Sequence, residues 1–240
     1  MSSPSFAFLA LRDHPYARVM MRHLLGAGLA PSIVIEEASA VAEEERSKFL
    51  ARMAGHPLPG SLQDQLTGTD CSFHSMPVHK SEALMKVLGG EDLDLIVLGG
   101  TRIIRGPVLG HPRHGVINAH PGLLPECRGS ASPAWSVRHD IPIGATAHFC
   151  DDGIDTGDLL LRREFPVRRG MTYEDLCIGT TELAGQLMQE SLLALEQGRW
   201  PQIRKAQGTS PWPTFRNASP EVIADVRAKL NEQRYAHYVD

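Results

Sequence analysis

Two polar side chains with complementary chemistry stand one residue apart near the middle of the chain. Asn118 and His120 follow the apolar pair Val116–Ile117 and precede Pro121, which is the pattern of a short buried strand that stops abruptly. Alternate residues of an extended backbone project to the same face, so the amide and the imidazole would lie side by side. Ligands of open α/β sheets bind at such strand ends, which makes this pair a candidate site.

A second stretch can bring a carboxylate to the same place. Residues 145–150 alternate in the manner of a strand and run directly into loop 151–157, which holds three aspartates and two glycines. A loop of this composition is unsuited to a hydrophobic core. We expect it to present Asp155 to a neighbouring strand end, with His120 as its natural partner.

These residues form a three-part motif. Asn-x-His-Pro-x-Leu-Leu-Pro occupies 118–125, Arg-Gly follows at 128–129, and Ile-Asp-Thr-Gly occupies 154–157. The motif resembles the signature of the folate-dependent formyltransferases, a family that includes methionyl-tRNA formyltransferase, glycinamide ribonucleotide transformylase and the sugar-nucleotide N-formyltransferases. The resemblance is dense from Leu95 to Val167 and weak elsewhere. It implies an enzyme that moves a formyl group from 10-formyltetrahydrofolate to a primary amine of a small acceptor, such as a nucleotide-linked amino sugar.

Three residues suit the chemistry of formyl transfer, and the resemblance implies that they are catalytic. When an amine attacks the formyl carbon, negative charge develops on the formyl oxygen and a proton must leave the amine. The Asn118 amide can donate a hydrogen bond to that oxygen without titrating. The His120 imidazole can take up the proton or add to the stabilisation of the oxygen. Asp155 can orient His120 and relay a proton through water.

The resemblance also implies where the pterin ring of the folate binds. In the family, the backbone of the segment after the strand at 94–100 cradles the pterin, and the backbone of the loop at 149–155 binds its edge. The residues expected to bind the cofactor on this basis are Gly100, Arg102, Ile103, Ile104, Cys150, Asp151, Asp152 and Gly153. Apart from the family, Ile103 and Ile104 would fit a hydrophobic core equally well. No metal is expected.

The acceptor is less constrained by the sequence. His14 lies in the turn after the first strand and could touch an acceptor, although a surface position is favoured. Arg128 could hold an anionic acceptor or pair with a carboxylate that fixes its loop, and the two interpretations are equal. Ser130 and Ser132 are interpreted as helix caps rather than nucleophiles. His148 is interpreted as a hydrogen-bonded core residue.

Some alternatives within the family are disfavoured. The turn at 12–15 lacks glycine, whereas glycinamide ribonucleotide transformylase has a glycine-rich phosphate loop at this point. The net charge of -4 and a tail too short for the second domain of methionyl-tRNA formyltransferases disfavour tRNA, so no nucleic-acid partner is expected. A formyl-folate hydrolase would use the same three residues, with water in place of the amine, and stays open.

Strand and helix signals alternate as in an α/β protein. Strands are predicted near residues 6, 33, 73, 95, 116 and 146 and over 159–166, and helices over 16–28, 81–88, 132–140, 172–197 and 221–230. The resulting fold is a Rossmann-like, doubly wound, mostly parallel sheet with a short C-terminal tail. We assign residues 1–199 to the formyltransferase domain and 200–240 to the extension. Residues 36–65 are interpreted as a solvated helix and a loop.

The composition is that of an ordinary globular protein, with 240 residues, 42% apolar and 22% charged. No apolar run is long enough to cross a membrane, so no membrane partner is expected. The N-terminal residues lack the pattern of a signal peptide. The four cysteines show no Cys-x-x-Cys spacing, which predicts reduced thiols in a cytoplasmic protein. A homodimer is a further open expectation.

Two other classes of protein compete with this interpretation. A metal-dependent hydrolase could use His111, His114, His120 and the aspartates of 151–158, but the His-x-x-His spacing encloses Pro-Arg and does not predict a helix. A non-catalytic folate or sugar binder of the same fold is the second rival. The presence of all three candidate catalytic residues argues against it.

Overall fold

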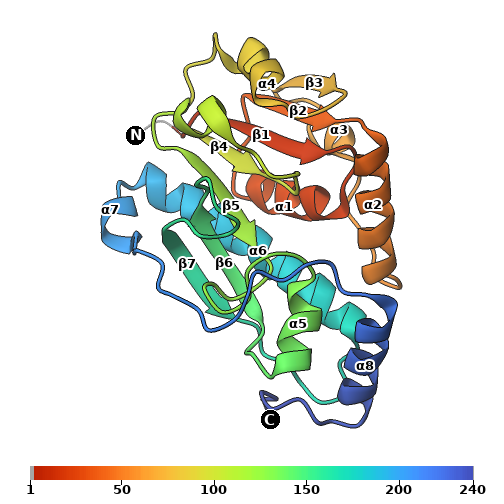
Figure 1. The fold of residues 1–240 in the computed structure, drawn as a ribbon. Coiled ribbons are helices and arrows are strands. Elements are labelled where there is room, and N and C mark those ends of the chain that lie inside the picture. The colour runs from red at the N-terminus through yellow and green to blue at the C-terminus, as the bar shows by residue number, and fades with distance from the viewer. Residues whose placement is uncertain (1–2, 240) are drawn as a thin grey trace.

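One seven-stranded sheet forms the centre of the protein. The computed structural model describes residues 3–239. The strands are β1 (Phe6–Leu11), β2 (Ile33–Glu37), β3 (Ser72–Met76), β4 (Leu95–Leu98), β5 (Val116–His120), β6 (Gly144–Phe149) and β7 (Leu159–Glu164), in the order β3-β2-β1-β4-β5-β6-β7. The first five strands in this order pair in parallel. The pairing of β6 with β5 and the pairing of β7 with β6 are antiparallel. The mostly parallel sheet expected from the sequence is confirmed (Figure 1).

Helices cover both faces of the sheet. They are α1 (Pro15–Gly26), α2 (Ala40–Arg52), α3 (Leu62–Gln65), α4 (Ser81–Leu88), the 3₁₀ helix η1 (Gly106–Gly110), α5 (Ser132–His139), α6 (Tyr173–Glu196), α7 (Trp200–Ile203) and α8 (Pro220–Asn231). The long helix α6 begins at a capping box, in which the Asp175 N–H donates to Thr172 Oγ1 over 3.1 Å and the Thr172 N–H donates to Asp175 Oδ2 over 2.7 Å. Such reciprocal capping satisfies backbone donors that a helix start leaves free.

The two-residue period of the strands sorts the core into two layers. Phe6, Phe8 and Ala10 of β1 pack in a cluster with α1 and α6, whereas Ala7 and Leu9 pack in a second cluster with α4 and η1. All of these side chains are buried, and burying one large apolar side chain contributes roughly 1.5–3 kcal/mol. The continuous apolar run of β1 is therefore explained by burial on both faces.

The position of the site follows from the strand order. The chain winds outward in one direction through β1, β2 and β3 and then returns to the other side of β1 with β4. The carboxyl ends of β1 and β4 therefore carry loops that diverge, and open α/β sheets bind ligands in the crevice this creates. Leu11 ends β1, and Leu98 ends β4 opposite Asn118 of β5.

Strand β6 runs in the opposite direction from the five strands that precede it in the chain. Two loops that each follow a strong strand signal are predicted to leave from the same edge of a parallel sheet, which would place the loop after β6 beside the loop after β4. Since β6 is antiparallel to β5, Phe149 at its carboxyl end lies beside Ile117 instead of beside His120. The loop at 150–157 reaches the site only by turning back along β5.

The segment at 36–65 is less solvated than its composition predicts. Strand β2 extends to Glu37, and both Glu36 and Glu37 are buried. The cause is their place at the end of an interior strand, between β1 and β3. Residues 40–52 then form the helix α2, most of which is exposed as expected.

The C-terminal extension packs on the sheet-and-helix body. The segment between α7 and α8 crosses the molecule, and α8 lies beside α5 (Figure 1). Val226, Leu230 and Tyr235 share a hydrophobic cluster with α5 and the first turns of α6. Midway along the crossing, Phe215 pairs with Gly129 through an isolated β-bridge. Within residues 3–239, no helix has both the length and the apolar character needed to span a membrane.

Gly129 should be irreplaceable at this bridge. Its φ is 95°, and a Cβ there would overlap the carbonyl oxygen of Phe215. Gly129→Ala should lower the free energy of unfolding by about 3 kcal/mol or more, from left-handed strain and steric overlap together. Gly170→Ala is the matched control, because Gly170 has a φ of 87° with open space around it and should cost only about 1–2 kcal/mol. Urea unfolding measures both, and equal costs would contradict the bridge's role.

Candidate active site

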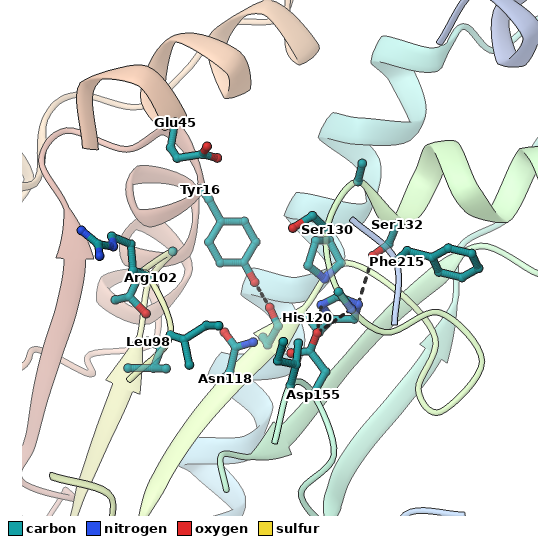
Figure 2. A pocket seen from close by; sticks show the side chains of 18 of the residues that line it. Tyr16, Glu45, Leu98, Arg102, Asn118, His120, Ser130, Ser132, Asp155 and Phe215 are labelled. Carbon is teal, nitrogen blue, oxygen red and sulfur yellow. Dashed lines mark hydrogen bonds and ion pairs between the residues drawn. The ribbon is translucent and has the colours of Figure 1, made fainter. Parts of the chain in front are cut away.

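A cavity of about 920 Å³ opens over the carboxyl ends of β1, β4 and β5. Its walls come from the turn before α1, from one side of α2 and α6, from the segment at 100–104, from the loop at 150–156 and from the tail at 214–217. Figure 2 shows Asn118, His120 and Asp155 together, with Arg102 to one side and Phe215 to the other. The cavity thus lies where the strand order places a ligand site.

The structure brings the three candidate catalytic residues together. His120 Nδ1 lies 3.6 Å from Asp155 Oδ2, and Asp155 Oδ1 lies 3.6 Å from Nε2 of His148. Asn118 is close to His148 as well, with 3.3 Å between Nδ2 and Nε2. One carboxylate therefore stands between two imidazoles, next to an amide.

Local backbone geometry holds Asp155 at this point. Its φ of 53° is in the left-handed region, which aspartate tolerates better than most residues. The Gly129 N–H donates to Asp155 Oδ2 over 2.8 Å, which ties the loop at 150–157 to the loop after β5. A side chain at Gly157 would overlap the Phe149 carbonyl, so glycine is needed where the loop turns back.

The partners of His120 define which nitrogen is available for chemistry. Nε2 lies 2.7 Å from the carbonyl oxygen of Cys127, which can only accept, so we assign the neutral-ring hydrogen to Nε2. Ser132 Oγ is 3.0 Å from the same nitrogen. This leaves Nδ1, which faces Asp155, as the basic atom of the ring. The His120 side chain is almost completely buried, so its orientation is fixed by these contacts.

Ser132 does not have the capping role expected from the sequence. The N-cap of α5 is Ala131, and no side chain caps that helix. Ser132 is the first residue of the helix and is buried, so its hydroxyl turns toward His120. Sequence reasoning missed this contact because it depends on where α5 sits relative to β5.

His148 is a hydrogen-bonded buried residue, as expected. Its Nδ1–H donates to the Phe149 carbonyl over 2.8 Å, so Nε2 is free to accept from the Asn118 amide. Burial lowers the pKa of His148, an effect that the nearby Asp155 opposes without reversing it. A neutral His148 therefore orients the Asn118 side chain with its nitrogen toward the ring.

His14 is buried, and the expected surface position is wrong. It is 3% exposed, its Nδ1 accepts from the Tyr16 N–H over 3.3 Å at the start of α1, and its ring packs on Phe49. Burial, together with the charge of Arg52, lowers the pKa of His14 to about 3. His14 nevertheless lines the cavity, as a neutral group. The Tyr16 hydroxyl donates to the carbonyl of Ala119 beneath it.

Most of the residues expected to bind the pterin line this cavity. They are Gly100, Arg102, Ile103, Ile104, Cys150, Asp151 and Gly153, whereas Asp152 lies outside. Within the described chain, the backbone N–H and C=O groups of 102–104 form no hydrogen bond with other protein groups. Ile103 is 56% exposed, so the family-independent expectation of a core position is wrong for it, whereas Ile104 is buried.

A buried carboxylate anchors the segment at 100–104. Arg102 NH1 lies 3.4 Å from Oε1 of Glu37, whose side chain is fully buried. Burial raises the pKa of Glu37, but hydrogen bonds from the His79 N–H and the Ser39 hydroxyl, with the charge of Arg102, bring it below its ordinary value. Glu37 was missed because its segment was interpreted as solvated.

Arg128 does not line the cavity. Its carbonyl accepts from the Phe215 N–H over 2.8 Å, and its guanidinium forms no ion pair with any residue of 3–239. The arginines that do line the cavity are Arg52, Arg102 and Arg216. One face of α2, with Val41, Glu45, Phe49 and Arg52, also lines it, and its three- and four-residue spacing was the signal available in the sequence.

The histidines of the competing metal site are not gathered around His120. His111 Nε2 lies 2.9 Å from the Leu88 carbonyl, and the exposed His114 packs edge-on against Trp200. Across residues 3–239, no group of three or more histidine, cysteine or acidic side chains has the arrangement of a metal site.

Comparison with known proteins identifies relatives of one kind. The formyl transferase family model matches residues 38–192. A methionyl-tRNA formyltransferase of Acidobacterium capsulatum is 42% identical over 105 residues, which are 43% of this chain and 34% of the relative. The matched segment thus spans about a third of that relative's length.

Solved structures share the fold at low sequence identity. A phosphoribosylglycinamide formyltransferase of Anaplasma phagocytophilum superposes with a TM-score of 0.63 and 18% identity over 90% of this chain and 100% of its own. A sugar N-formyltransferase of a Shewanella species gives 0.59 and 17% identity over 89% of this chain and 76% of its own.

Burial of neutral His14 should make the protein sensitive to acid. Between the folded-state pKa of about 3 and the ordinary value near 6.5, the unfolded chain binds a proton that the folded chain does not. The free energy of unfolding therefore falls as pH falls through this window. His14→Asn keeps a cap acceptor for α1 and should reduce the pH dependence by roughly 1 kcal/mol per pH unit. Urea unfolding at several pH values measures the slope, and equal slopes would contradict this assignment.

Proposed function

The chain belongs to the formyl transferase family, and on that premise we propose that it is an N-formyltransferase that uses 10-formyltetrahydrofolate to formylate a primary amine of a small acceptor. The observation that supports the proposal most is the meeting of Asn118, His120 and Asp155 at one end of the cavity. An amide donor, an imidazole and a carboxylate are the groups that acyl transfer to an amine requires.

The residues present fit the folate donor. A volume of about 920 Å³ is within the usual range of small-molecule sites. The free backbone groups of 102–104 offer donors and acceptors to the edge of a planar heterocycle, and Ile103 and Ile154 offer exposed apolar surface. These segments would hold the pterin, and the bound donor would supply a formyl group on a nitrogen that can leave.

Asn118 would stabilise the charge that develops on the formyl oxygen. Its Nδ2 donates one hydrogen to His148, and the second hydrogen has no partner among residues 3–239. This free N–H is held in advance by the neutral imidazole, so little reorganisation is needed when charge appears. Catalysis of this kind depends on the donor's being fixed before the reaction begins.

His120 would accept the proton that leaves the attacking amine. Because Nε2–H is engaged by the Cys127 carbonyl, the proton is taken up at Nδ1. The imidazolium so formed lies 3.6 Å from Asp155 Oδ2, which stabilises its charge. Asp155 keeps its orientation throughout, because the Gly129 N–H holds the same oxygen.

The identity of the acceptor is part of the proposal, and a second candidate acceptor has support of its own. A relative that is 42% identical over 105 residues is named a methionyl-tRNA formyltransferase, which supports an aminoacyl-tRNA as the alternative acceptor and qualifies the expectation of no nucleic-acid partner. The solved sugar N-formyltransferase supports an amino sugar by fold alone. Hydrolysis of formyl-folate would use the same groups, with water as the nucleophile.

A mass-spectrometric screen tests the proposed function. The full chain is incubated with 10-formyltetrahydrofolate and a panel of primary amines that includes amino sugars, their nucleotide conjugates and methionyl-tRNA. Gain of one formyl group by a member of the panel is the expected result. Release of formate in every mixture, with no formylated amine, would replace the transferase by a hydrolase.

Loss of the Asn118 amide should slow transfer without weakening donor binding. Asn118→Ala should lower single-turnover transfer by roughly 10² to 10³, the usual effect of removing one donor to a developing oxyanion. The affinity for 5-formyltetrahydrofolate, a non-reacting analogue, should be unchanged because the pterin would be held by backbone groups. Asn231→Ala, at the exposed end of α8, is the control. A loss of affinity with normal transfer would exclude Asn118 from the chemistry.

His120 and Asp155 should behave as one unit. His120→Ala and Asp155→Asn should each reduce transfer severely, and the double variant should be little worse than either alone, because each group works through the other. Single-turnover rates beside analogue affinity for the three variants measure this. Near-normal transfer by His120→Ala would overturn the proton-transfer role, and additive losses would show that Asp155 acts separately.

A further inference from the structure

Two arginines at the tail side of the cavity have no acidic partner within residues 3–239. Arg52 ends α2, and Arg216 follows Phe215 in the crossing segment of the tail. Neither forms an ion pair with any carboxylate of residues 3–239. The two positions belong to one neighbourhood, since the Arg52 guanidinium donates to Oδ1 of Asn217 over 3.3 Å.

Packing directs the charge of Arg52 toward the cavity. The side chain is half-buried, and its guanidinium carbon lies 5.2 Å from the centre of the Phe49 ring. Its positive charge contributes to the lowered pKa of the buried His14. An arginine held by an aromatic ring and an amide keeps most of its hydrogen-bond donors free for a ligand.

The backbone around Arg216 is held by contacts with α5 and with the loop after β5. The Arg216 carbonyl accepts from Trp135 Nε1 of α5 over 2.7 Å, and its neighbour Phe215 bridges to Gly129. The same Gly129 donates to Asp155. The Arg216 side chain is exposed, but the position of its backbone is set by the loop that contains Gly129, whose N–H donates to the candidate catalytic Asp155.

Of the other charged side chains that line the cavity, Arg102 and Glu45 have oppositely charged partners, whereas Asp151 and Asp155 are held by uncharged hydrogen-bond donors. Arg102 pairs with Glu37, and the Glu45 carboxylate accepts from Lys48 Nζ over 2.8 Å. Asp155 lies between two histidines. Arg52 and Arg216 are thus the cationic side chains of the cavity that have no acidic partner among residues 3–239, and a concave site concentrates the field of such charges.

We infer that Arg52 and Arg216 form a subsite for an anionic group of the acceptor, so that the acceptor carries a phosphate or a carboxylate besides its primary amine. The inference rests on the proposed function for the identity of the ligand as an acceptor. Both anions match the planar fork of a guanidinium, which binds them through paired hydrogen bonds. The subsite takes the place of the anion-binding role considered for Arg128, which lies outside the cavity.

Direct binding of simple anions tests the subsite without any formyl chemistry. Inorganic pyrophosphate and succinate are titrated separately into the full chain by calorimetry, with Arg52→Gln, Arg216→Gln and the control Arg199→Gln beside the wild type. Arg199 is exposed, precedes α7 and lies outside the cavity. Each cavity variant should weaken binding roughly tenfold, as expected for losing a charge-assisted contact, and the control should not.

The two anions distinguish the sources of charge. Binding of pyrophosphate alone supports a phosphorylated acceptor, and binding of succinate alone supports a carboxylate. No binding of either anion by the wild type, or binding unaffected by both cavity variants, overturns the subsite. Unchanged affinity of the variants for 5-formyltetrahydrofolate shows that they are folded.

The amine screen separates this inference from the proposed function. Acceptors that carry an anion should be formylated at least tenfold more efficiently than matched neutral amines, and Arg52→Gln should reduce that preference. Equal efficiency on matched neutral amines overturns the subsite while leaving formyl transfer intact. Anion binding that depends on both arginines, with no amine formylated, supports the subsite and overturns the proposed function.

Discussion

The burial of one carboxylate is the constraint on which the site depends. The Asp155 side chain is only 15% exposed, and a carboxylate withdrawn from water is costly unless charges and hydrogen-bond donors replace its hydration. Here the Gly129 N–H donates to Oδ2, and the imidazoles of His120 and His148 lie 3.6 Å from its two oxygens, so that a proton taken up by His120 would be stabilised by this carboxylate. Each of these groups is itself fixed by a second contact, so the position of Asp155 is determined from three sides.

The need to hold Asp155 beside His120 also accounts for the path of the loop that follows the antiparallel strand β6. The loop after β6 leaves beside Ile117 and must turn back to bring Asp155 to His120. Gly157 permits the close approach to β6, and the left-handed conformation of Asp155 completes the turn. The return path also carries the loop past the carboxyl end of β4, so one wall of the cavity and one candidate catalytic residue come from the same few residues.

Local patterns were enough for the strands and for the central residues of the site. Alternation predicted that Asn118 and His120 share a face, and apolar runs together with alternating patterns predicted the seven strands, because these signals depend only on near neighbours in the sequence. The direction of β6 and the burial of His14 were not accessible in this way. Both depend on which distant segment packs alongside, as does the contact of Ser132 with His120.

The two ends of the cavity differ in how their charged side chains are arranged. This difference affects whether membership of the family can identify the acceptor. At 102–104, the charged Arg102 is paired with Glu37, and the free hydrogen-bonding groups are backbone. Such a wall suits a constant partner. The other end consists of the α2 face, which lies inside the family match at 38–192, and of the tail at 214–217, which lies beyond it. Side chains at that end can vary without disturbing the buried carboxylate. Proteins with this architecture are therefore expected to share the chemistry of formyl transfer while using different acceptors. The identity of the acceptor has to be inferred from residues such as Arg52 and Arg216, because the motif around Asn118 and His120 is common to the reaction.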